Sequence, residues 1–207
     1  MNFLNYTWET LKEAYYSAFD LIAANLLWAV FTLLIVTAPP AFAGLYYVAH
    51  QLTHEELISP RTFLEGFRTY FWLSWRWFLV FIGMLGLLLI NFWFYRNIDT
   101  AWAPWMQGFF LGLMILWLLI NLYSFPILLE QSDKSVRLAL KNSLVVFMRT
   151  PGTSLSLVLF LLVLAILSTI LQIPWLLFTP SLSAYLITRF LFQSIEQIQN
   201  TTKNNQL

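Results

Sequence analysis

The chain lacks cysteine, carries little charge and has only seven glycines. Without cysteine it has neither disulfides nor thiolate metal ligands. Charged residues make up 10% of its 207 residues, against about a quarter in soluble domains, and the net charge of +1 indicates neither nucleic acid nor acidic substrates as partners. The glycines form no phosphate-binding loop, and no serine lies in a Gly-x-Ser-x-Gly elbow. The sequence signatures of several large enzyme classes are therefore missing.

Apolar and aromatic residues dominate instead. The chain is 59% hydrophobic, with ten Trp and nineteen Phe, and its mean hydropathy is +0.70. Such a chain has too little polar surface to cover a soluble globule, and amphipathic rings favour the headgroup boundary of a bilayer. We therefore expect an integral membrane protein that is embedded in a lipid bilayer.

The stretch 25–51 shows the pattern that organises the chain. No charged residue lies between Asp20 and His50, and an apolar run of this length can cross a bilayer at 1.5 Å per residue. Pro39 and Pro40 then break or kink the helix. The pattern predicts a membrane span, a proline hinge and an interfacial helix.

The whole chain is predicted to be an all-α, polytopic membrane helical bundle with amphipathic interfacial helices. Residues 1–20 form an amphipathic interfacial lead-in, and residues 194–207 form a polar, disordered tail. A single transmembrane domain covers residues 21–193, with five spans at about 21–38, 72–95, 105–129, 153–171 and 175–192. If the proline segments re-enter the membrane instead of bending at its surface, this count changes.

A helix–proline–helix unit recurs three times. Residues 33–47, 119–129 and 176–186 each end an apolar run with proline and continue with helical periodicity. Chance recurrence is the alternative, because proline is common in membrane helices. We interpret the prolines of these units as structural hinges: Pro39, Pro40, Pro126 and Pro180.

Residues 130–149 form the most basic segment. Lys134, Arg137 and Lys141 follow helical spacing on one face, and Arg149 lies at its end. These cations are candidates for docking anionic lipid or a cytoplasmic partner, although the same charges would also orient the protein. Cations gather on the side of the membrane that includes the C-terminus, whereas the opposite side holds Lys12 and Arg96. The positive-inside rule predicts the N-terminus outside and the C-terminus in the cytoplasm.

His50 and His54, spaced i and i+4, can share one face of a helix, with Glu55 and Glu56 nearby. A metal site needs a further firm ligand, and the order of residues is not His-Glu-x-x-His. We therefore interpret both histidines as surface residues. No metal, cofactor or catalytic residue is predicted.

The span interiors contain no Asp, Glu or Lys, and Arg76 and Arg189, which lie near span ends, are expected to snorkel to the basic membrane surface. Intramembrane charge marks transport paths and proton relays, so its absence argues against a proton-coupled transporter or a charged pore. Asn91, Asn121 and Gln107 are expected to hydrogen-bond between helices, and Gly108 and Gly112 could allow close helix packing.

Several segments resemble the YesL-like family of bacterial membrane proteins, known as domain of unknown function 624. They are NLLW at 25–28, TAPPAFAGLYYV at 37–48, FLEGFR at 63–68, FPILL at 125–129, LALKNSLVVFMRTPGTSL at 138–155 and TPSLSAYLITRF at 179–190. The family often has Ile-Gly-Pro where this chain has Ala38-Pro39-Pro40. The resemblance implies a multispan protein of the bacterial plasma membrane, often encoded beside genes for carbohydrate uptake and degradation.

Three hypotheses for function remain. The first is a non-enzymatic accessory or assembly protein of a membrane transporter complex, linked to carbohydrate uptake, and it rests on the missing catalytic residues, the basic helices and the resemblance. The second is a small-solute transporter or channel, because broken helices often mark transport sites. The third, a membrane-embedded lipid enzyme, has the least support, since no nucleophile, base or metal set is recognisable.

Overall fold

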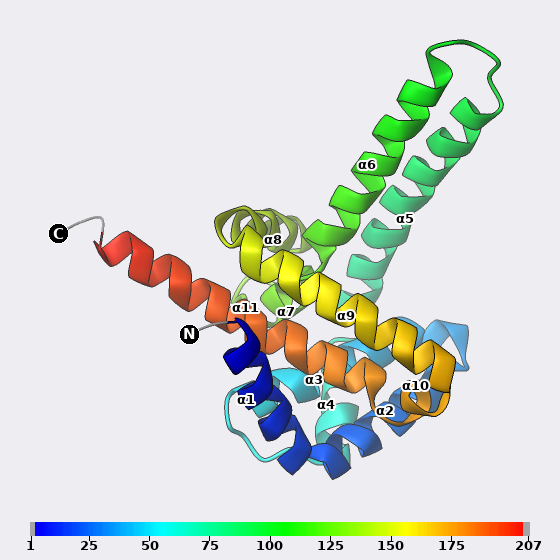
Figure 1. The fold of residues 1–207 in the computed structure, drawn as a ribbon. Helices are drawn as coiled ribbons and strands as arrows, with labels where there is room; N and C mark the ends of the chain where they lie inside the picture. Colours follow the sequence, from blue (N-terminus) through cyan, green and yellow to red (C-terminus); the bar gives the residue numbers. More distant parts are fainter. Residues whose placement is uncertain (1–2, 205–207) are drawn as a thin grey trace.

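The computed structural model describes residues 3–204, and these residues form helices and connecting turns without a strand (Figure 1). The predicted all-α fold is thereby confirmed. The elements are α1 Phe3–Tyr16, α2 Ala18–Thr32, the 3₁₀ helix η1 Ile35–Thr37, α3 Ala38–Thr53, α4 Pro60–Thr69, α5 Phe71–Arg96, α6 Ala103–Asn121, α7 Ser124–Glu130, α8 Val136–Arg149, α9 Pro151–Leu171, α10 Ile173–Leu177 and α11 Thr179–Asn204.

Three helical stretches are long and apolar enough to cross a membrane: α5, the α6–α7 stretch Ala103–Glu130, and α9. They correspond to the second, third and fourth predicted spans. The bent pair α1 and α2, whose axes differ by 79°, adds a fourth if it counts as one span. On its own, α2 has 15 residues and reaches about 22 Å, which is less than a hydrocarbon core of about 30 Å.

The C-terminal segment differs from its prediction. The fifth predicted span, 175–192, is divided between α10 and the first half of α11, and α11 continues to Asn204. Residues 194–204 are thus helical where we predicted a disordered tail, while residues 205–207 lie outside the described part. The reason is a stripe of apolar side chains on α11: Leu191 is buried, and Ile195 and Ile198 pack against the core.

The core surrounds α3, which packs against α2, α4 and α11. Its residues Ala41, Ala43 and Ala49 are fully buried, and these small side chains let the neighbouring helices approach closely. Opposite them, α11 contributes Leu186, Phe190 and Leu191, which are also fully buried. The central helices thus pack on each other through complementary small and large side chains.

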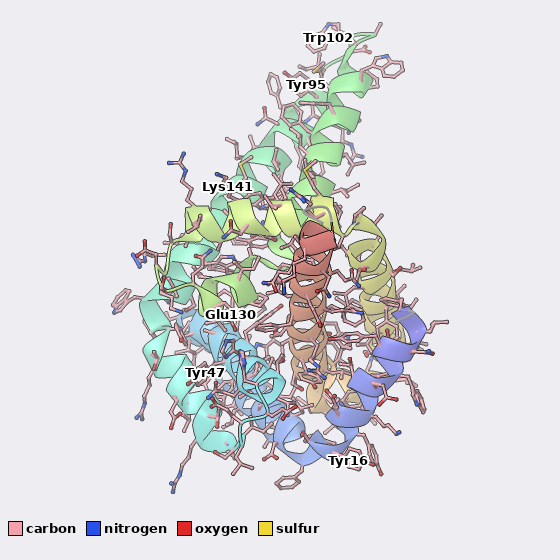
Figure 2. The ribbon with its side chains drawn as sticks, turned by 90° about the vertical axis from the view of Figure 1, so that its left-hand side faces the viewer. Tyr16, Tyr47, Tyr95, Trp102, Glu130 and Lys141 are labelled. Carbon is pink, nitrogen blue, oxygen red and sulfur yellow. The ribbon has the colours of Figure 1, made fainter. Side chains whose placement is uncertain are left out.

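The hairpin of α5 and α6 projects away from this core (Figure 1). Its side chains are mostly exposed and apolar, including Leu87, Ile90 and Phe109. Tyr95 and Trp102 lie at its tip (Figure 2), with their ring centroids 5.7 Å apart. Apolar helices with aromatic residues at their ends are typical of helices that lie in lipid.

The prolines of the three repeated units all lie in the first turns of helices. Pro39 and Pro40 follow Ala38 at the start of α3, Pro126 is the third residue of α7, and Pro180 is the second residue of α11. Proline is tolerated in a first turn because the backbone N–H it lacks would have no intrahelical acceptor there. The prolines therefore begin new helices after breaks in the chain. Their role as hinges remains a prediction.

Candidate functional site

His50 and His54 lie at the C-terminal end of α3. His50 is in the last turn, and His54 is the residue that follows the helix, so both imidazoles leave the same end. The side chain of His50 is mostly buried, while that of His54 is 42% exposed. The shared face expected from the i, i+4 spacing is present, because the two ring centroids are 4.6 Å apart.

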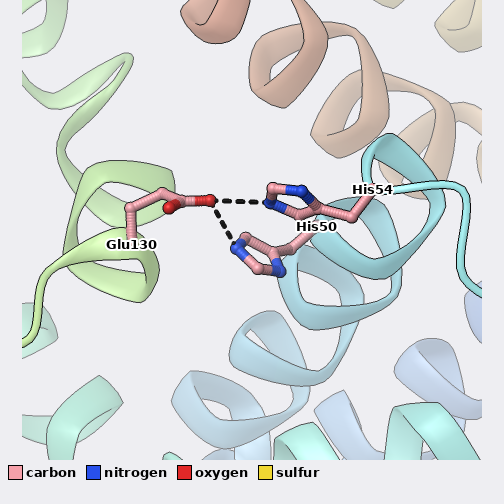
Figure 3. A group of neighbouring side chains, drawn as sticks. All are labelled: His50, His54 and Glu130. Atoms are coloured by element: carbon pink, nitrogen blue, oxygen red, sulfur yellow. Dashed lines mark hydrogen bonds and ion pairs between the residues drawn. The ribbon is translucent and has the colours of Figure 1, made fainter.

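Glu130 completes a cluster with the two histidines (Figure 3). It is the last residue of α7 and about 80 positions away in the sequence. Its Oε1 atom lies 2.7 Å from Nε2 of His50 and 2.9 Å from Nε2 of His54. We name His50, His54 and Glu130 the HHE cluster. Sequence reasoning did not find this third residue.

The surroundings of the HHE cluster hold its side chains in place. The ring of Tyr47 stacks near that of His50 at 6.5 Å, and Phe192 of α11 meets the His54 ring edge-on at 5.1 Å. Nδ1 of His50 is buried without a hydrogen-bond partner.

Lys134 lies close to the HHE cluster but is engaged elsewhere. Its Nζ donates a hydrogen bond to the carbonyl of Leu129 and lies 5.6 Å from the centre of the Tyr70 ring. Burial lowers the pKa of its amino group, and the Glu130 carboxylate partly opposes that shift. Glu130 thus keeps its hydrogen bonds to the two histidines.

A cleft of about 570 Å³ opens beside Glu130. Its wall includes Tyr6, Arg189, Phe192, Gln193 and Glu196, so it lies between α1, α7 and α11. Oε1 of Gln193 and Nε of Arg189 are buried without hydrogen-bond partners. The lining of the cleft therefore mixes aromatic, amide and charged side chains, while these two atoms are covered by the protein.

Arg189, which we expected to snorkel toward a membrane surface, instead pairs with α1. Its Nη2 atom lies 2.6 Å from the Glu13 carboxylate. The hydroxyl of Tyr185 donates to the same carboxylate at 2.7 Å, and that of Tyr6 donates to the Arg189 carbonyl at 3.0 Å. These bonds hold α1 against α11 along one side of the cleft.

The four cations predicted to dock lipid or a partner differ in position and exposure. Arg137, Lys141 and Arg149 are exposed on α8 (Figure 2 labels Lys141), whereas Lys134 precedes that helix and is half-buried. The same side of α8 exposes Leu138, Val145 and Met148. Cations mixed with exposed apolar side chains are typical of helices at a headgroup interface. Whether this surface binds lipid or a protein remains a prediction.

Exposed apolar helices around a small helical core define a polytopic membrane protein of the all-helical class. Within that class, residues 21–92 match the family described as protein of unknown function, DUF624, which confirms the resemblance found in the sequence. The matched segment runs from α2 to α5 and includes both histidines, but not Glu130. No curated protein and no solved structure matches the chain.

Proposed function

We propose that this chain is a non-enzymatic accessory or assembly protein of the bacterial plasma membrane, which docks another membrane complex against its α5–α6 hairpin. The observation that carries the proposal is the isolation of that hairpin. Its two helices pack mainly on each other and project from the body (Figure 1). The most apolar window of α5 is only 11% buried within the chain.

Glycines on the hairpin support a helix as the docked partner. Gly83 and Gly86 on α5, and Gly108 and Gly112 on α6, have no atom within 4 Å of the position that a Cβ would occupy. Small residues at the surface of a membrane helix let a second helix approach closely. The Gly108 and Gly112 pair is thus free for a partner, since it packs against nothing within the described chain.

A carbohydrate importer is the expected partner, and this part of the proposal rests on the family resemblance. The test is purification from native membranes in mild detergent, followed by quantitative mass spectrometry. We expect an importer component at a constant ratio to the chain. A preparation without a stoichiometric membrane partner would contradict the accessory role.

Two matched variants locate the docking surface. Gly112→Leu adds a large side chain to the hairpin, and Gly152→Leu makes the same change at the start of α9, where the space is equally open. We expect the first variant to lose the partner and the second to retain it. Equal retention by both would exclude the hairpin as the docking surface.

A small-solute transporter is the second candidate, and the polar cleft beside Glu130 favours it. The cleft is lined by amide and charged side chains, including Gln193 and Glu196, and such groups bind polar solutes. Solute flux into proteoliposomes, across a panel of sugars and oligosaccharides, separates the two functions. Flux that is lost in Gln193→Leu would replace the accessory role with transport, and no flux for any solute would exclude this candidate.

A further inference from the structure

We infer that the HHE cluster is a binding site for a divalent transition-metal ion such as Zn²⁺, held by Nε2 of His50, Nε2 of His54 and the carboxylate of Glu130. Within the described residues, the three ligand atoms lie within 4.8 Å of one another. Two imidazoles and one carboxylate are a ligand set that zinc and iron use in proteins, and it leaves at least one coordination position open.

The chain contains few residues that could form such a metal site, and they lie together. The chain contains two histidines in total and no cysteine. Both histidines point at one oxygen atom of a carboxylate that arrives from a different helix (Figure 3). Scattered surface histidines do not require this arrangement, whereas a metal ion requires several ligand atoms that point at one place.

The distances suit an ion after a small adjustment. Ligand atoms at about 2.0–2.1 Å from a tetrahedral zinc ion lie about 3.3 Å apart. The observed separations of 2.7 and 2.9 Å from Oε1 must therefore widen by roughly half an ångström. Side-chain rotation of His54 and Glu130, each more than a third exposed, is sufficient for this change.

The position of the HHE cluster also favours a cation. The histidines leave the C-terminal end of α3, a helix of 16 residues, and this end carries partial negative charge. The amino group of Lys134 is directed to the Leu129 carbonyl and the Tyr70 ring, so it does not occupy the site. Glu130 also borders the 570 Å³ cleft, so an open coordination position is accessible to water or a small polar ligand.

Metal binding would tie the N-terminal half of the core to the segment after α6. His50 and His54 belong to the family-matched residues 21–92, and Glu130 lies 76 positions beyond His54. A ligand that binds only the folded chain stabilises it by mass action. Zn²⁺ is therefore expected to raise the midpoint of thermal unfolding.

The experiment uses the full chain, purified in detergent with a tag that contains no histidine and then treated with a chelator. Zn²⁺ is titrated in competition with a chromophoric chelator, and Co²⁺ is added in a parallel sample to record its d–d absorption. We expect one Zn²⁺ per chain and a Co²⁺ spectrum typical of four or five ligands. The absence of saturable Zn²⁺ binding would overturn the inference.

Three variants assign the ligands. His54→Gln and Glu130→Gln keep the size and hydrogen-bonding capacity of the side chains, and each is expected to lower Zn²⁺ affinity at least about tenfold, the loss seen even for outer-shell changes. Glu55→Gln removes the neighbouring carboxylate outside the HHE cluster and is expected to bind Zn²⁺ as the wild type does. Unchanged affinity in both cluster variants would overturn the assignment. If either variant fails to fold, the Co²⁺ spectrum of the wild type still decides the outcome.

Discussion

Asn25 is fully buried where α2 passes the junction between α10 and α11. Its Nδ2 donates to the carbonyls of Trp175 and Leu176 at 3.2 and 2.7 Å, and its Oδ1 accepts from the backbone N–H of Ser181 at 3.0 Å. One side chain thus satisfies three backbone groups that the helix break leaves without intrahelical partners. Asn25 fixes the place at which the chain enters α11.

Replacing Asn25 with leucine should destabilise the fold by about 3 kcal/mol, because three buried backbone groups lose their partner. The measurement is the unfolding free energy in detergent. Asn91→Leu is the matched control. Asn91 was expected to bond between helices, but within the described residues it donates to the Leu87 carbonyl one turn earlier in its own helix, so we expect a change below about 0.5 kcal/mol. Equal effects of the two substitutions would refute this role for Asn25.

Neither Asn25 nor Glu130 could be assigned a role from the sequence. Asn25 is a lone polar residue in an apolar run, and its partners lie about 150 positions away. In the sequence, Glu130 is an acidic residue directly after the predicted span 105–129, and no local pattern indicates its partners. Both roles depend on how distant helices pack, and local periodicity carries no information about that packing. The spacing of His50 and His54, a local feature, did predict their shared face.

At the level of elements, two glycines bring α3 and α4 into close contact. A Cβ at Gly44 would lie 2.8 Å from the Phe63 ring, and one at Gly66 would lie 2.8 Å from Cγ of Tyr47 and still closer to its Cβ. Real Cβ atoms do not approach other atoms this closely. The two glycines therefore set the separation of the helices, and Phe31 of α2 packs on Phe67 of α4 at 4.8 Å.

Gly66→Ala is expected to destabilise the protein by about 1–3 kcal/mol, because the added methyl group meets the rigid Cβ of Tyr47 and the helices must separate. Gly86→Ala, in open space on α5, should be neutral or stabilise by up to about 1 kcal/mol. Thermal unfolding of both variants in the same detergent tests this difference in sign. A Gly66→Ala protein as stable as the wild type would show that α3 and α4 can separate freely.

The exposed cations of α8 lead to a prediction about lipid. Replacing Arg137, Lys141 and Arg149 together with glutamine should weaken retention of anionic lipid by up to about a hundredfold, because each cation near an anionic surface contributes on the order of 1 kcal/mol. Lipid mass spectrometry after purification in mild detergent measures the retained lipid. Arg96→Gln, at the far end of α5, is the control and should leave retention unchanged. Equal retention by the triple variant and the wild type would leave orientation as the only role of these charges.

Helices were predictable where the sequence pattern was long and uniform. The predicted spans 72–95 and 153–171 agree closely with α5 and α9, because uninterrupted apolar runs admit one interpretation. Prolines also marked the starts of α3, α7 and α11. The prediction is wrong for the end of α11, because a disordered tail is predicted from residue 194 whereas the helix continues to Asn204.

For the whole molecule, charge distribution predicts orientation. The positive-inside rule places the C-terminus in the cytoplasm and the tip of the α5–α6 hairpin outside. The chain has no native cysteine, so Asp99→Cys and Lys203→Cys can be labelled without background. In intact cells, a membrane-impermeant maleimide should label position 99 and not position 203. Labelling of position 203 alone would reverse the predicted orientation.

Docking through the isolated hairpin is the central claim, and photo-cross-linking in native membranes tests it most directly. A photoreactive amino acid at position 112 lies on the exposed face of α6, and one at position 152 lies in equally open space at the start of α9. We predict that position 112 cross-links to one membrane protein in high yield while position 152 does not. Cross-links from position 112 to lipid alone, at the level found for position 152, would contradict the account.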